Sequence, residues 1–420
     1  MAGTIPSEPR LIHRAWLDAP ETRAVFAAIE AGGYEARAVG GAVRNALLGR
    51  QVKDVDIATP ALPQEVLRLA ASAGLKAVPT GVEHGTVTVI SGGAPFEVTT
   101  LRKDVETYGR HAAVAYTDDW AADAARRDFT INALYCGPDG RIYDPLAGYG
   151  DLVARRVRFI GEARTRIRED YLRILRFFRF TAEYADGPPD PEGLSAAVAE
   201  RAGLKLLSGE RIRQELVRLL AAPRALAAVE AMYDYGLITE LLGLAPRPRL
   251  LRRLALIEDG RGLVPSPILR LAALVVEVME DAERLNARLK LSNAERASLL
   301  ASAVGDSGAL REPPLDTAAG KAFIYRHGAR AYRDLVLMAW TRALTAATDD
   351  PQWSAKLDLA DTWRPPKFAL TGSDVMALGI AEGPRVGELL RRTEEWWIAA
   401  GFPDDRELLL AQLQAAARTP

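Results

Sequence analysis

The pattern of apolar residues changes once along this 420-residue chain, near residue 150. Before that point, short runs rich in β-branched residues alternate with glycine, aspartate and proline, which is typical of strands. The runs lie at 36–39, 55–58, 86–90, 96–101 and 141–143, and helices are expected at 42–48 and 63–73. After residue 150 the spacing is helical, as for Ile212, Leu216 and Leu219. We therefore expect an α+β protein: a small N-terminal α/β head with a β-sheet, followed by an elongated all-α neck, body and tail.

Charge is balanced overall and uneven locally. The chain holds 54 Lys and Arg against 55 Asp and Glu, which argues against a globally basic nucleic-acid binder. Residues 151–180, however, hold nine arginines against four carboxylates, and residues 205–253 hold nine basic against five acidic residues. A basic helical segment in the middle of the chain can bind along a polyanion, although helix faces exposed to solvent explain such a charge pattern about equally well.

Cysteine and histidine are scarce. The single cysteine, Cys136, excludes an internal disulfide and a cysteine-rich zinc site, and indicates a reduced, cytoplasmic protein. The four histidines are scattered, so a histidine-built metal site is not expected. No run approaches the ~18 apolar residues of a membrane span, and the N-terminus lacks the apolar core of a signal peptide, so neither a membrane partner nor export is expected.

The most informative stretch contains a double glycine followed by two aspartates. A strand that runs into Gly40 and Gly41 and then a helix, with Arg44 one turn on, presents backbone N–H groups to a phosphate. The next strand carries Asp54 and Asp56, which project from one face because side chains alternate along a strand. Two such carboxylates repel each other unless a cation lies between them, and their hard oxygen ligands suit Mg²⁺.

A third carboxylate lies on another expected strand. Glu97 points away from Phe96 and Val98 and could join the aspartate pair, although an outward glutamate on a strand is also ordinary. Double glycines and Asp-x-Asp pairs each occur without function in many proteins. Their combination on neighbouring elements is far more specific than either alone.

Two further clusters combine acids with arginines. In residues 126–132, an aspartate beside paired arginines offers an acceptor for a ribose hydroxyl and cations for a phosphate. Residues 168–179 are expected to form one helix, on which Asp170, Arg173 and Arg176 step by three and could hydrogen-bond the edge of a base. Taken alone, ion pairs on a helix surface explain the first cluster equally well and the second better.

With these clusters in this order, the sequence closely resembles the bacterial class II tRNA nucleotidyltransferases, the CCA-adding enzymes, and the related poly(A) polymerases. The resemblance runs from about Ala36 to Leu220 and extends weakly to the C-terminus. It implies template-independent addition of CCA to the 3′ end of tRNA from CTP and ATP, with release of pyrophosphate. It also implies a catalytic nucleotidyltransferase head at 1–150, a neck with a base-template helix at 151–205, a helical body at 206–330 and a tRNA-binding tail at 331–420.

The resemblance also assigns roles to residues. Asp54 and Asp56 would hold two Mg²⁺ ions, with Glu97 as a third catalytic carboxylate near them. The nucleotide would be bound by Gly40, Gly41, Arg44, Arg127, Asp128, Asn132, Glu169, Asp170, Arg173 and Arg176. Within this set, Arg127 and Asp128 would select the ribose 2′-hydroxyl, Asp170 and Arg173 would face the base, and Glu169 would hold the arginine. Residues 208–216 would brace the template helix, and residues 102–116 would form a flexible loop that helps the switch from C to A addition.

Several alternatives remain open at this point. Asn45 stands where the family usually has aspartate, which puts the details of phosphate or metal binding there in doubt. Residues 102–116 disfavour a CC-only enzyme, and the C-terminus lacks the basic extension typical of bacterial poly(A) polymerases, whereas no residue separates A-only from full CCA addition. Outside the family, the aspartate pair disfavours a silent RNA-binding module. The basic middle disfavours, less firmly, nucleotide transfer to a protein or small molecule. Oligomeric state is not indicated.

Overall fold

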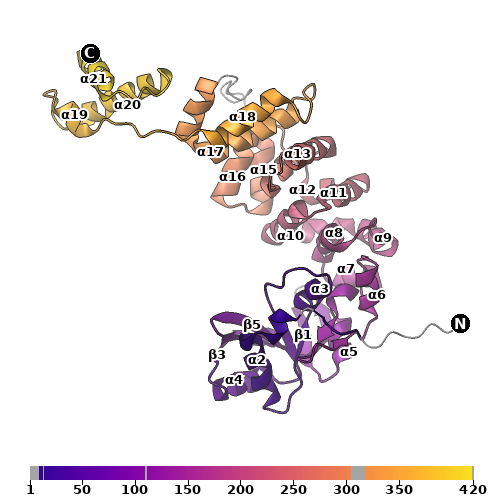
Figure 1. The fold of residues 1–420 in the computed structure, drawn as a ribbon. Helices are drawn as coiled ribbons and strands as arrows, with labels where there is room; N and C mark the ends of the chain where they lie inside the picture. The colour runs from indigo at the N-terminus through magenta and orange to yellow at the C-terminus, as the bar shows by residue number, and fades with distance from the viewer. Residues whose placement is uncertain (1–8, 13, 109–110, 304–316, 419–420) are drawn as a thin grey trace. The chain divides into compact units, whose positions relative to one another are not determined.

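The structure is a computed structural model that describes residues 9–12, 14–108, 111–303 and 317–418 (Figure 1). The chain divides into two compact units, Met1–Gly243 and Leu244–Pro420. The first contains a sheet and helices, and the second is helical in its described part. The expected α+β class is confirmed. Within the described ranges, no helix has both the length and the apolar sequence that a bilayer crossing requires.

A mixed seven-stranded sheet forms the centre of the head. Its strand order is β3-β4-β5-β2-β1-β8-β9. The strands are β1 (Arg37–Val39), β2 (Asp56–Thr59), β3 (Lys76–Gly81), β4 (Thr86–Ser91), β5 (Ala94–Thr100), β8 (Tyr135–Cys136) and β9 (Ile142–Tyr143). Of these pairings, β2 with β5 is parallel and the others are antiparallel. The five strands expected from the sequence are present, while β3 and β8 were not expected.

Alternating apolar residues fix which side of the sheet is buried. In β4 the side chains of Val87 and Val89 are buried, and in β5 those of Phe96 and Val98 are buried. Helices α2 (Pro20–Glu30) and α4 (Pro63–Ser72) pack against this part of the sheet (Figure 1). Helices α1 (Ala15–Asp18), α3 (Gly41–Leu47) and α5 (Trp120–Ala125) complete the head. This packing fixes the register of the strands that carry Asp56 and Glu97.

The segment expected as a flexible loop contains a β-hairpin. Strand β6 (Arg102–Tyr108) pairs antiparallel with β7 (His111–Tyr116), and the two form a sheet of their own. The pairing satisfies backbone N–H and C=O groups that a loop would leave to water. Gly109 and Arg110 lie outside the described residues.

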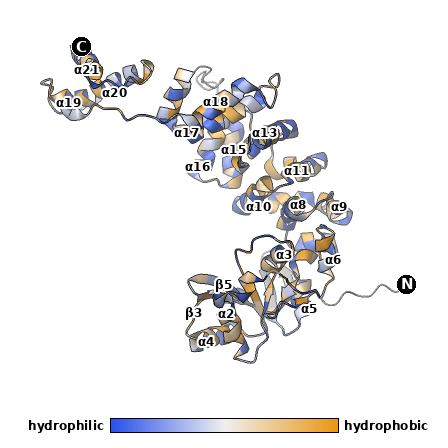
Figure 2. Ribbon diagram, in the orientation of Figure 1, coloured by the Kyte–Doolittle hydropathy of each residue, from blue (hydrophilic) through white to orange (hydrophobic). Residues whose placement is uncertain are grey.

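Helices make up most of the chain after residue 147. The first unit contains α6 (Gly148–Val153), α7 (Ala163–Glu169), α8 (Leu172–Tyr184), α9 (Pro191–Ala199), α10 (Gly209–Ala221), α11 (Ala225–Asp234) and α12 (Leu237–Leu242). The second contains α13 (Pro248–Gly260), α14 (Pro267–Val275), α15 (Met279–Leu289), α16 (Asn293–Ser302), α17 (Thr317–Arg342), α18 (Pro351–Thr362), α19 (Gly372–Met376), α20 (Pro384–Ala399) and α21 (Arg406–Arg418). Apolar and polar residues share the same helices (Figure 2), as amphipathic packing requires. The four-part division remains a prediction; helix α17, kinked at Gly328, runs through its expected boundary at residue 330.

The expectation of one helix over 168–179 was wrong. Helix α7 ends at Glu169, Asp170 has extended backbone angles (φ −156°, ψ 106°), and α8 begins at Leu172. The Asp170 carboxylate accepts a hydrogen bond of 3.1 Å from the Leu172 backbone N–H. Such a side-chain bond competes with the helical ladder and favours the start of a new helix.

We expect Gly148→Ala to destabilise the head strongly. A Cβ atom at Gly148 would lie 2.1 Å from the backbone oxygen of Thr130, so one of the two segments must move. The expected loss in the free energy of unfolding is about 1–3 kcal/mol, as for other overpacked sites. Gly150→Ala, in the same helix, is the matched control because nothing lies within 4 Å of its Cβ position. Equal chemical denaturation midpoints for the two variants would contradict the close approach.

Candidate active site

An open cavity of about 550 Å³ lies within the first unit. The β1–α3 turn, β2 and residues 127–132 form its head side, and α8, α10 and the α7–α8 junction form the rest. All but three of the residues predicted for the site line this cavity; the exceptions are Asp54, Glu97 and Glu169. The three sequence clusters, far apart along the chain, therefore meet at one place.

Of the three predicted carboxylates, Asp56 lines this cavity. Asp56 is the first residue of β2 and is in register with Glu97 of β5, and Asp54 precedes the strand. Burial raises the pKa of Asp56, as do the negative charges of Glu97 and Asp54, while Arg127 opposes the shift. Concentrated negative charge of this kind favours binding of a cation.

Asp54, Asp56 and Glu97 remain the predicted candidate ligands for a metal ion. In the described part of the chain, no group of three or more His, Cys, Asp and Glu side chains is placed to hold a metal ion. Glu97 is in register with Asp56 and adds negative charge beside it, and its catalytic role remains a prediction. Asp54 and Asp56 supply the hard oxygen donors that a divalent cation would share with a triphosphate.

The β1–α3 turn requires glycine and lies against an arginine. Gly40 has φ +68°, a conformation that L side chains rarely adopt. A Cβ atom there would lie 3.7 Å from Nη1 of Arg127, so the turn passes close to that guanidinium. The backbone of the β1–α3 turn and the Arg127 side chain therefore form one wall of the cavity.

Arg44 is fixed beside this turn. Its guanidinium donates hydrogen bonds to Asn132, to the Tyr184 hydroxyl at 2.7 Å and, from Nη2, to Asn45 at 3.1 Å. Burial lowers its pKa. The Asn45 side chain, found where the family usually has aspartate, thus serves as a neutral acceptor for Arg44.

The carboxylate of Asp128 bridges the head and α8 rather than pairing with its neighbouring arginines. It accepts a 2.8 Å hydrogen bond from Nε of Arg176 and a 2.9 Å bond from Nδ2 of Asn132. Burial opposes ionisation of Asp128, but Arg176 and these hydrogen bonds outweigh it and lower the pKa. Asp128 is therefore an ionised acceptor at the cavity wall.

The α7–α8 junction is held by a second set of ion pairs. Glu169 accepts hydrogen bonds from both Arg166 and Arg173, and Nη1 of Arg173 also donates to the Arg166 carbonyl at 2.7 Å. The Asp170 carboxylate accepts a 2.5 Å hydrogen bond from Arg211 of α10. Asp170 and Arg173 are thus presented side by side at the cavity.

Helix α10 braces α8, as the resemblance implied for residues 208–216. Glu215, which is buried, accepts a hydrogen bond from Arg179 and lies 3.6 Å from Arg176. Together with the pair between Arg211 and Asp170, this contact fixes the face of α8 that lines the cavity. The orientation of Arg176 is therefore set from both Asp128 and Glu215.

Four functional candidates were missed from the sequence: Asp123, Arg179, Arg211 and Arg218. Three of them line the cavity, and Asp123 lies behind it. A signal for Asp123 was present, since it precedes Arg126 and Arg127 by three and four residues on a helix. Arg211 and Arg218, seven residues apart, share a helix face for the same reason.

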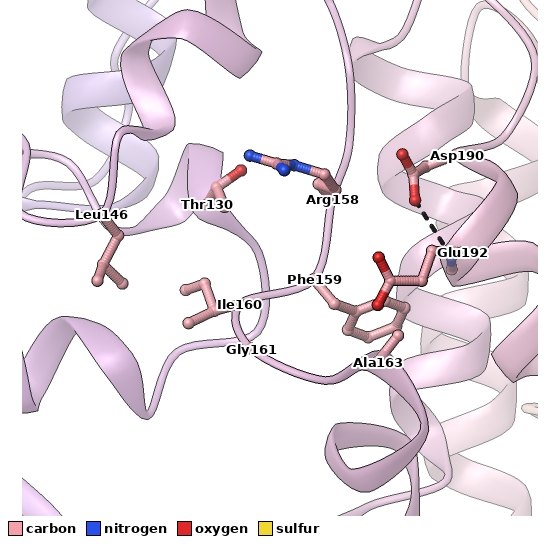
Figure 3. Close-up of a pocket in the computed structure, with 10 residues that line it drawn as sticks. Thr130, Leu146, Arg158, Phe159, Ile160, Gly161, Ala163, Asp190 and Glu192 are labelled. Carbon is pink, nitrogen blue, oxygen red and sulfur yellow. Dashed lines mark hydrogen bonds between the residues drawn. The ribbon is translucent and has the colours of Figure 1, made fainter.

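A second, smaller cavity of about 220 Å³ is lined by Thr130, Arg158, Asp190 and Glu192, among others (Figure 3). Its polar groups largely serve the fold: Nε of Arg158 donates to Asp151 at 3.0 Å, and Asp190 accepts from the Gly193 N–H at 3.2 Å. It shares no lining residue with the larger cavity. The larger cavity is therefore the better candidate for the active site.

Two family models match the chain. Residues 36–158 match the model described as "Poly A polymerase head domain". Residues 189–247 match the one described as "Probable RNA and SrmB- binding site of polymerase A". The first match contains Gly40, Asp56 and Arg127, and the second contains Arg211 and Arg218.

Named proteins match this chain in sequence or in structure. It is 35% identical over 388 residues to the mitochondrial CCA tRNA nucleotidyltransferase 1 of Mus musculus, covering 91% of this chain and 87% of the relative. It is 41% identical over 225 residues to the CCA-adding enzyme of Geobacillus thermodenitrificans, about half of each chain. Among solved structures, the Bacillus stearothermophilus CCA-adding enzyme in complex with CTP matches with a TM-score of 0.69 at 29% identity, covering 95% of this chain and 97% of the other.

Proposed function

The chain belongs to the family of CCA-adding tRNA nucleotidyltransferases, and we propose that the 550 Å³ cavity is where it adds CCA to the 3′ end of tRNA from CTP and ATP. One observation carries this assignment: the glycine turn, the arginine–aspartate cluster and the α7–α8 junction converge on that cavity. Phosphate, ribose and base would each meet the residue types that suit them. A single such site needs no nucleic-acid template.

Nucleotidyltransferases of this kind use divalent metal ions, and we place two Mg²⁺ ions at Asp54 and Asp56. The fit rests on the donor chemistry: two carboxylates with hard oxygen atoms, one with its pKa raised by burial and by neighbouring negative charge. When bound, the metal ions would neutralise the triphosphate and favour the ionised tRNA 3′-hydroxyl as the nucleophile at the α-phosphate.

The chain's own residues would position the nucleotide. Arg127, which the resemblance assigns to the ribose 2′-hydroxyl, lies against the β1–α3 turn and is with that turn placed to bind phosphate. Asp128, kept ionised by Arg176, is placed to accept a hydrogen bond from a ribose hydroxyl. Asp170 and Arg173 offer an acceptor and donors to the edge of a base. Phosphoryl transfer depends mainly on such positioning and charge neutralisation.

We expect the purified chain to complete tRNA from both intermediate ends. Transcripts that end before CCA, after CC and after CCA would be incubated with CTP, ATP or both. The expected products are CC from CTP alone on the first, a single A on the second, and no addition to the third. Addition of CC to the first transcript without addition of A to the second would indicate a CC-only enzyme. Addition of A to the second transcript without addition of C to the first would indicate an A-only enzyme. Long A tails would indicate a poly(A) polymerase.

Two further assignments remain proposals. A cytoplasmic location rests on the composition, with Cys136 free and buried, whereas the mouse relative named above is mitochondrial. Binding of tRNA by the tail at 331–420 rests on the resemblance alone.

A further inference from the structure

Asp123 of α5 is an almost fully buried carboxylate, with 1% of its surface exposed, on which four donors converge. Oδ1 accepts a 2.9 Å hydrogen bond from Nε of Arg126 and a 3.3 Å bond from the Arg102 backbone N–H. Oδ2 accepts a 3.1 Å bond from Nη2 of Arg127 and a 2.8 Å bond from the Tyr135 hydroxyl. Both oxygens are therefore fully used by the protein.

Such a carboxylate would be costly to bury without these partners. Burial opposes its ionisation, but Arg127 and Arg126 outweigh burial and lower the pKa of Asp123. It carries a full negative charge at neutral pH, and it lines neither of the cavities described above. Its action at the active site must therefore pass through a group that it holds.

That group is Arg127. Nη2 is bound by Asp123, and Nε donates to the Tyr135 hydroxyl at 3.4 Å. Nη1 has no hydrogen-bond partner among the described residues and lies beside the β1–α3 turn at Gly40. The backbone is also held, because Nη2 of Arg166 donates to the Arg127 carbonyl at 2.8 Å. One edge of the guanidinium is anchored, and the other faces the cavity.

We propose that Asp123 is a positioning residue for nucleotide binding: it anchors the Arg127 guanidinium so that Nη1 is preset toward the phosphate-binding side of the cavity. The inference rests on the proposed function, since it names what orients an arginine of that site. An anchored guanidinium loses little conformational freedom when it binds a phosphate oxygen, so its presetting lowers the Kd of the nucleotide. Tyr135, which bonds both Asp123 and Arg127, completes the anchor.

The test is CTP affinity, measured by calorimetry on the full chain without tRNA. Asp123→Asn keeps the shape of the side chain and removes its charge, and we expect it to raise the Kd for CTP about tenfold. The double variant Asp123→Asn/Arg127→Ala should bind CTP no more weakly than Arg127→Ala alone, because Asp123 acts through Arg127. Independent, multiplied effects of the two substitutions would overturn the proposal, as would an unchanged Kd in Asp123→Asn.

Asp151→Asn is the matched control. Asp151 is equally buried, is hydrogen-bonded by Arg156 at 2.8 Å and Arg158 at 3.0 Å, and lies outside the nucleotide cavity. Asp151→Asn changes the Kd for CTP by some factor, and this factor should multiply with the factor by which Arg127→Ala changes it. If Asp123→Asn does not fold, Tyr135→Phe takes its place in the test. We expect Tyr135→Phe to raise the Kd for CTP two- to threefold, and we expect no such rise when Arg127 is already replaced by alanine. A rise in Kd that persists in the Arg127→Ala background would overturn the proposal. Wild-type protein that binds CTP but transfers nothing would instead contradict the proposed function.

Discussion

Asp56→Asn will lower the rate of nucleotide incorporation about 10³-fold or more while tRNA binding survives. The reason is the loss of one of the two carboxylates that we propose as ligands of the metal ions, whose charge stabilisation in such reactions amounts to several kcal/mol. Incorporation of radiolabelled CTP into tRNA lacking CCA measures the rate, and a filter-binding assay measures tRNA affinity. Glu83→Gln, which changes an exposed carboxylate of the head, is the control. Near-normal turnover by Asp56→Asn would contradict the metal assignment.

The same substitution should not weaken the metal-free fold. The pKa of Asp56 is higher in the folded chain than in the unfolded chain. Protonated Asp56 therefore contributes to the stability of the fold below the ordinary aspartate pKa, and this contribution is lost as the pH rises through the pKa of Asp56 in the folded chain. At neutral pH the ionised carboxylate therefore costs stability, and asparagine removes that cost. In EDTA at pH 7 the Tm of Asp56→Asn should equal or exceed that of the wild type, and the difference should shrink toward pH 4. A lower Tm at pH 7 would indicate a structural role.

The sequence predicted the sheet best where burial alternates along the strand. In the strands that contain Val87 and Val98, every second side chain is buried, and such alternation is typical of a half-buried strand. Strand β8, by contrast, is only Tyr135–Cys136 and is buried throughout, so no alternation marks it. Its place beside β1 comes from tertiary pairing, which local sequence does not report.

The candidate site was predicted by motif and only partly by geometry. Most of the residues predicted for the site line the cavity, but the ion pair between Asp128 and Arg176 of α8 was not predicted. The break at Asp170 was missed because helical spacing continues across it, while one side-chain hydrogen bond ends the helix. Long-range ion pairs and local capping were therefore the features that the sequence left open.

That break determines how a base would be selected. Asp170 leaves the helical path and is bonded by Arg211, while Arg173 lies in the first turn of the next helix and is held by Glu169. An acceptor and a donor group therefore lie at the same cavity. Neither side chain is free to rotate away without losing its partner. Selection of CTP and ATP over UTP and GTP would then rest on fixed hydrogen-bonding groups rather than on cavity size.

Arg173→Ala will reduce the preference for CTP and ATP over UTP and GTP by about 10- to 100-fold, because a well-placed pair of hydrogen bonds to a base contributes about 1–3 kcal/mol of discrimination. Binding of the triphosphate should weaken much less, since Arg44 and Arg127 remain. Asp170→Asn should act in the same direction: it keeps an acceptor for the Leu172 N–H and converts the other oxygen into a donor. Single-turnover incorporation with each of the four nucleotides measures the preference. Arg218→Ala removes another cavity arginine from α10 and should slow all four alike; unchanged discrimination in Arg173→Ala would show that the base is read elsewhere.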